Sequence, residues 1–189
     1  MQKFSLVGCM ILFCTLAGCG GKYTSTEFVR EDVDFNIITR IAVLPLQNNT
    51  GQRNLQQGIR NVAITQLLAQ GIADVVDRGI VDSVLFEEVI DPNQPIDMIN
   101  LKRLGQRLNV QAFMMGSVDM SQGTKGKGYP QLALSLRLIE SQSGAVIWSS
   151  SGHWSSESLA GKIFGITPTD SFHVNIKLLD SMIESLAKN

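Results

Sequence analysis

The chain has 189 residues, of which 44% are hydrophobic and 17% are charged, and its formal net charge is -1. This balance is typical of a globular domain and argues against a disordered chain, and the near-neutral charge gives no reason to expect nucleic acid as a partner. Its three cysteines, Cys9, Cys14 and Cys19, all precede residue 20. The rest of the chain therefore offers no thiol for a disulfide, a zinc site or a nucleophile.

The first 19 residues have the pattern of a secretion signal. Lys3 gives a positively charged start, and residues 4–16 form an apolar run that is too short to span a bilayer as a permanent helix. The run ends in Leu16-Ala17-Gly18-Cys19, which resembles the lipobox of bacterial lipoproteins. There are two alternative interpretations: an ordinary signal peptide with a chance cysteine, and a membrane helix.

The lipobox resemblance implies cleavage between Gly18 and Cys19, so that residues 1–18 are a lipoprotein signal peptide. In bacterial lipoproteins the cysteine carries a diacylglyceryl group and an acyl chain, so the expected attached group is this lipid, with no other cofactor. Several acyl chains hold a protein firmly to a bilayer. Gly20 stands where an aspartate is the usual retention signal, and this favours the periplasmic face of the outer membrane.

Residues 19–38 are mostly polar, and we expect them to form the lipidated N-terminus and a short tether, with an edge strand as an option at its end. A flexible segment of about 18 residues spans roughly 20–25 Å, which is too short to cross a peptidoglycan layer.

Residues 39–189 are predicted to form one αβ domain. Short apolar or alternating runs predict strands at 40–46, 72–76, 112–120, 132–139 and 145–154. Apolar residues spaced by three and four predict helices at 55–70, 79–88 and 98–108, and from Pro168 to the C-terminus. The order β-α-β-α-α-β-β-β-α predicts an α/β (α+β) two-layer sandwich, in which helices pack against a mixed sheet of about five strands.

Three stretches, residues 40–51, 104–116 and 137–148, together resemble the curli-secretion lipoprotein CsgG and its small relatives. These relatives include the peptidoglycan-synthase activator LpoB and the amino-terminal domain of TolB. The resemblance covers about residues 39–187 and implies an αβ domain used for assembly rather than catalysis. It also implies an envelope protein as partner, with homo-oligomerisation as an option. The membrane is a further partner, through the lipid anchor.

Two departures from this family narrow the expected function. The loops at 121–128 and 155–168 are too short to hold the hairpins of a membrane pore. The segment 20–38 is shorter than the linker with which the synthase activator crosses the cell wall. We therefore expect a non-catalytic accessory or assembly lipoprotein. Regulation of a peptidoglycan synthase is the alternative, and binding of a small ligand is less favoured.

No residue pattern indicates a catalytic centre or a metal site. The nucleophile motif G-x-S-x-G is absent, and the two histidines, His153 and His173, are expected to be structural or at the surface. Polar or aromatic residues in loops and at a strand end are candidate partner contacts: Asn48, Asn49, Lys125, Lys127, Trp154 and Phe164. Each has a plainer interpretation, namely a turn, a solvated loop or core packing.

Overall fold

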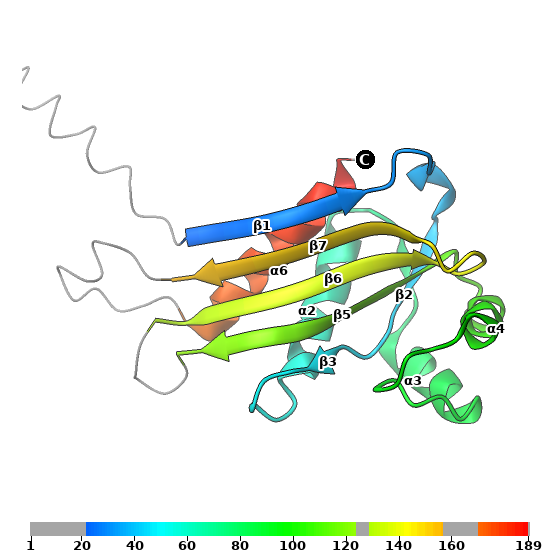
Figure 1. Ribbon diagram of the computed structural model, residues 1–189, viewed down its shortest axis with the longest axis horizontal. Coiled ribbons are helices and arrows are strands. Elements are labelled where there is room, and N and C mark those ends of the chain that lie inside the picture. Colours follow the sequence, from blue (N-terminus) through cyan, green and yellow to red (C-terminus); the bar gives the residue numbers. More distant parts are fainter. Residues whose placement is uncertain (1–21, 124–128, 157–169, 189) are drawn as a thin grey trace, which may run out of the picture.

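Strands from both halves of the chain form a single mixed sheet, which the computed structural model describes for residues 22–123, 129–156 and 170–188 (Figure 1). The strands are β1 (Lys22–Val29), β2 (Arg40–Val43), β3 (Gln47–Asn48), β4 (Asp74–Val75), β5 (Ala112–Gln122), β6 (Gln131–Glu140) and β7 (Val146–Ser155). Their order is β1-β7-β6-β5-β2-β4, and β3 pairs with β5. The helices are α2 (Leu55–Ala69), α3 (Arg78–Glu87), α4 (Met98–Leu108) and α6 (Ser171–Ala187), with a short 3-10 helix η2 (Phe35–Ile37). The predicted mixed sheet with packed helices is confirmed.

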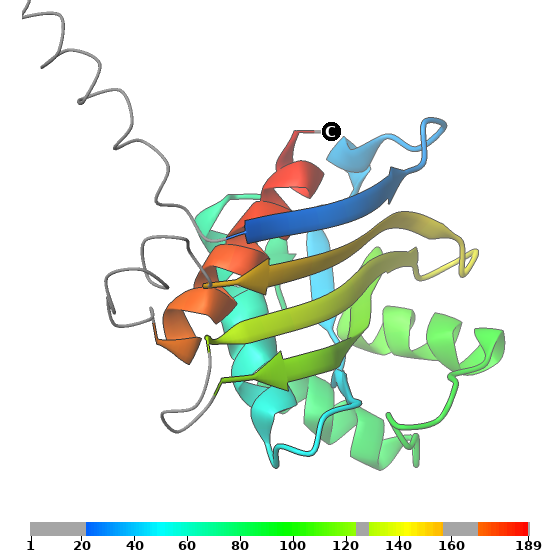
Figure 2. The same ribbon diagram turned by 60° about the vertical axis from the view of Figure 1, so that its left-hand side comes forward.

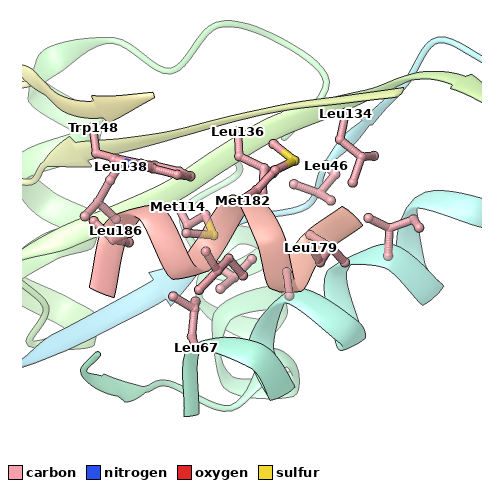
Figure 3. Close-up of a cluster of buried hydrophobic side chains, with 14 of the residues drawn as sticks. Leu46, Leu67, Met114, Leu134, Leu136, Leu138, Trp148, Leu179, Met182 and Leu186 are labelled. Carbon is pink, nitrogen blue, oxygen red and sulfur yellow. The ribbon is translucent and has the colours of Figure 1, made fainter. Parts of the chain in front are cut away.

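Two helices, α2 and α6, cover one face of the sheet (Figures 1 and 2). The alternation in β6 places every second residue on this face, and each of these four residues is almost fully buried: Leu132, Leu134, Leu136 and Leu138. Figure 3 shows Leu136, Leu138 and Trp148 from the sheet packed with Met182 and Leu186 from α6. This cluster is the main core of the domain.

The opposite face is covered only in part. The helices α3 and α4 bury a second apolar cluster against the β2 and β5 end of the sheet, around Leu44, Leu104 and Phe113. The two-layer arrangement therefore holds over β1, β7 and β6, while the other end of the sheet has helices on both sides (Figure 2).

Two strands exceed the predicted number. The edge strand considered at the end of the polar tether occupies most of that segment, because β1 pairs antiparallel with β7 along its whole length, from Lys22 to Val29. Its Thr, Tyr, Phe and Val residues favour extended structure. The two residues of β3, expected in a loop, pair with Ser117 and Val118 of β5. Both differences arise from long-range pairing, which local patterns do not reveal.

The predicted helices are found with small shifts at their ends. Asp97 caps α4, since its carboxylate accepts the backbone N–H of Asn100 at 2.9 Å. The last helix begins at Ser171 with Asp170 as its cap, and Pro168, expected in its first turn, lies outside the described residues.

The helix α2 carries a buried cation that the apolar pattern does not predict. Arg60 is 4% exposed, and its guanidinium donates to the carbonyl of Val43 through Nε at 3.0 Å and Nη2 at 2.7 Å. Nη1 donates to Asp82 of α3 at 2.6 Å. Burial lowers the pKa of Arg60, and the hydrogen bond to Asp82 opposes that shift. This residue ties α2, β2 and α3 together.

Glu88 links α3 to α4. Its carboxylate accepts from Arg107 at 2.7 Å and from Arg103 at 3.0 Å, and Arg107 also reaches Glu87 at 2.6 Å. Hydrogen bonds, first from Arg107 and then from Arg103, lower the pKa of Glu88, so the carboxylate stays ionised at neutral pH.

Candidate interaction surface

On the side of the sheet that faces away from α6, β1 and the parts of β7, β6 and β5 that lie beyond the second apolar cluster carry no helix (Figures 1 and 2). We call this surface the open face. Side chains on it form cross-strand rows, in which Thr26 lies beside Ser151 and Ser151 beside Ser135, while Phe28 neighbours Ser149 and Ser149 neighbours Arg137. None of these side chains is buried. The sequence thus places small hydroxyl groups, one aromatic ring and one cation on an accessible surface.

A β-bulge in β5 brings a carboxylate onto the open face. The register shifts between Val118 and Met120, so Asp119 has no direct partner on β6. Its carboxylate accepts from Ser117 Oγ at 2.6 Å, Ser135 Oγ at 2.7 Å and Asn49 Nδ2 at 3.1 Å. The three donors hold the carboxylate in place and join the 47–50 segment to the sheet.

A cleft of about 410 Å³ adjoins the open face, between the strands and the loop that leads from α3 to α4. Its walls combine apolar groups from the loop and helix, including Ile96 and Met98, with Met115 of the sheet. Ser117 and Arg137 add polar groups from the strands. Methionine and arginine are both enriched at protein interfaces, so Met98, Met115 and Arg137 favour a protein partner for this cleft.

The predicted contact residues Asn48 and Asn49 have different roles. Asn48 is half-buried, and its amide donates to the carbonyl of Gln52 at 2.7 Å while its oxygen accepts from Thr50 Oγ1 at 2.7 Å. Asn48 therefore shapes its own loop. Asn49 is exposed and contacts Asp119, which places it at the border of the open face.

The two tryptophans, six residues apart on β7, share the face that packs against α6. Trp148 is fully buried, and its indole N–H donates to Ser185 Oγ at 3.3 Å. Trp154 is half-buried, with its ring centroid 5.8 Å from that of Tyr23. Trp154 is the one that keeps accessible surface, at the end of β7.

Four other predicted positions lie outside the described residues: Cys19, Lys125, Lys127 and Phe164, as does the cleavage position Gly18. His153 lies on the open face and His173 in the first turn of α6. In the described ranges, no group of three or more His, Cys, Asp or Glu side chains could hold a metal ion. Within the same ranges, none of the helices has the length and apolar character that a membrane span requires.

Sequence reasoning missed Asp119 and Arg137. A signal for Asp119 was available, because it is the single charge in the apolar strand sequence AFMMGSVDMSQ. Arg137 lies on the exposed side of β6, where a positively charged side chain is common and gives no signal of a site. Only the position of the 92–98 loop makes Arg137 part of a cleft.

No protein-family model matches the chain, and no curated protein sequence matches it. Solved structures with a similar fold include the PelC dodecamer from Paraburkholderia phytofirmans, at a TM-score of 0.61 and 18% identity over 88% of this chain and 98% of that chain. Lipoprotein GNA1162 from Neisseria meningitidis has a TM-score of 0.56 and 16% identity over 80% of this chain and 98% of that chain.

The C-terminal domain of LpoB from Escherichia coli is less similar, with a TM-score of 0.45 and 16% identity over 61% of this chain and 81% of that chain. The resemblance to CsgG itself stays a prediction. The chain has the fold of PelC and of GNA1162, a fold that occurs in bacterial lipoproteins.

Proposed function

We propose that the mature protein is anchored through a lipid on Cys19 at the periplasmic face of the outer membrane. There it acts as a non-catalytic accessory or assembly factor, through contacts with an envelope protein and with copies of itself. The lipobox-like sequence and the shared fold with lipoprotein GNA1162 support the anchor. The description of PelC as a dodecamer supports self-association.

The observation that carries the proposed protein–protein contacts is the cleft beside the open face. It is concave, its walls combine apolar and polar groups, and it contains the exposed cation Arg137. A partner that inserts an apolar side chain and offers an acidic group to Arg137 would fill it. In many interfaces a few such anchor side chains, each buried in a pocket of the partner, supply most of the binding energy.

Replacing Arg137 with glutamate should convert the assembled protein into a monomer. The substitution reverses the charge in the cleft, while Arg137 is exposed, so the fold should be retained. The measurement is the mass of the processed protein, extracted in mild detergent, by light scattering after size-exclusion chromatography. Lys177→Glu makes the same charge change on the exposed side of α6 and should leave the mass unchanged. A monomeric unsubstituted protein would disprove self-association, and an assembled Arg137→Glu variant would disprove a role of the cleft in self-association.

The variant Cys19→Ala should incorporate no labelled palmitate and should yield no mature membrane-bound form. Only a thiol forms the thioether to diacylglycerol, so no other side chain replaces it. Metabolic labelling of whole cells and mass spectrometry of the N-terminal peptide measure both effects. Cys14→Ala removes a thiol from the same apolar run and should leave labelling intact. Labelled palmitate on the Cys19→Ala variant would contradict the anchor.

A further inference from the structure

Very little chain separates the proposed lipid attachment site from the folded domain. Cys19 precedes Lys22, the first residue of β1, by three residues, which reach at most about 11 Å when fully extended. All eight residues of β1 are paired with β7, so the start of this strand is fixed in the sheet. If Cys19 carries the lipid of the proposed function, this end of the sheet must lie at the membrane surface.

Several other elements begin or end at the same place. Lys22 pairs with Ser155 at the end of β7, Ser155 pairs with Gln131 at the start of β6, and Gln131 pairs with Gln122 at the end of β5. The first turn of α6 lies at this end as well (Figures 1 and 2). We call this end of the domain the anchor end.

Amphipathic aromatic residues gather at the anchor end. The chain has two tryptophans and two tyrosines, and apart from the buried Trp148 all of them lie here. Tyr23 is the second residue of β1, Trp154 is next to the last residue of β7, and Tyr129 comes two residues before β6. All three are half-buried. Phe172, in the first turn of α6, is 61% exposed.

These side chains have the physical character of a membrane interface. Tryptophan and tyrosine combine a large apolar ring with a polar group, and they concentrate where hydrocarbon meets the lipid headgroups. Tyr23 and Trp154 contact each other and also pack against the main core, which fixes their orientation. Phe172 adds an exposed apolar ring whose burial in lipid would be favourable.

We infer that Tyr23, Tyr129, Trp154 and Phe172 form an aromatic collar that contacts the lipid headgroup layer and holds the domain upright on the membrane. This inference rests on the proposed lipid anchor and goes beyond it. A lipid alone permits any orientation within reach of its short linker, whereas the collar selects one. With the domain upright, the open face and its cleft run parallel to the membrane normal. Partners can then reach them from the side.

The test uses site-specific labels on the processed, lipidated protein in vesicles of phosphatidylethanolamine and phosphatidylglycerol. In the mature form Cys19 is blocked by lipid, so a cysteine introduced by substitution is the only free thiol. Phe172→Cys carries an environment-sensitive fluorophore at the anchor end. Phe86→Cys is the matched control, because Phe86 is 85% exposed and also lies on a helix, α3, away from the anchor end (Figure 1).

Lipids with a nitroxide near the headgroup should quench most of the emission of the label at position 172 and leave the label at position 86 unchanged. The same lipids should quench part of the tryptophan emission, and Trp154→Phe should abolish that quenching, since the remaining Trp148 is buried. Equal quenching at positions 172 and 86, or none at either, on protein that floats with the vesicles would overturn the collar and leave the anchor intact. Protein that does not float with the vesicles would refute the anchor, and the collar with it.

Discussion

Replacing Trp148 with alanine should lower the free energy of unfolding by about 3–5 kcal/mol, the range found for large aromatic residues removed from a core. Trp148 is fully buried, and its ring lies between the sheet and α6 (Figure 3). The substitution leaves a cavity and also removes the donor to Ser185. Urea denaturation followed by far-ultraviolet circular dichroism measures the loss.

Trp154→Ala is the control for Trp148→Ala, because it removes the same side chain from the same face of the same strand. Trp154 is only half-buried and packs against Tyr23, so its removal should cost clearly less. Equal losses for the two variants would contradict the assignment of Trp148 as the core residue.

Replacing Asp82 with alanine should lower the free energy of unfolding by about 2–3 kcal/mol, because it leaves the buried charge of Arg60 without its counterion. We expect less than the roughly 3–5 kcal/mol lost when a fully buried ion pair is broken, since the side chain of Asp82 is 46% exposed and solvent screens its interaction with Arg60. Urea titration of purified variants measures the change.

The double variant Arg60→Met/Asp82→Ala should lose less stability than the sum of the two single variants. Methionine keeps much of the buried volume and needs no counterion, so only the carbonyl of Val43 stays without its donors. The exposed pair of Glu184 and Lys188 is the control, and Glu184→Ala should change stability by less than about 0.5 kcal/mol. Additive losses at Arg60 and Asp82 would show that they do not act as a pair.

The spacing of apolar residues predicted those helices and strands whose buried side chains recur at the helix or strand repeat. The alternation of leucines in β6 and the stripe of leucines in α4 after Asp97 each specify one buried face. Arg60 was missed because it is polar, although it lies three residues before Ala63 and seven before Leu67 on the buried stripe. Its hydrogen bonds to Val43 depend on where β2 lies, which the spacing of apolar residues does not reveal.

The candidate surfaces were harder to predict than the core, because each is assembled from distant parts of the chain. Asn49 was recognised from its place after a strand, but its partner Asp119 depends on a bulge whose position only the β5–β6 register reveals. Tyr23 and Trp154 meet because β1 pairs with β7. In the sequence they stand near opposite ends, and neither position alone indicates a shared site.

The pairing of β1 with β7 has a consequence for the order of folding. Among the strands that the structure describes, β1 pairs with β7 alone, so it has no neighbour until residues 148–155 are available. A polypeptide that emerges from a ribosome or a translocation channel with its N-terminus first therefore presents this segment unpaired until late. Closing so large a loop is an entropically unfavourable and slow step. Until that step β7 keeps a free edge that β1 later covers, and a free edge of this kind is a site where aggregation begins.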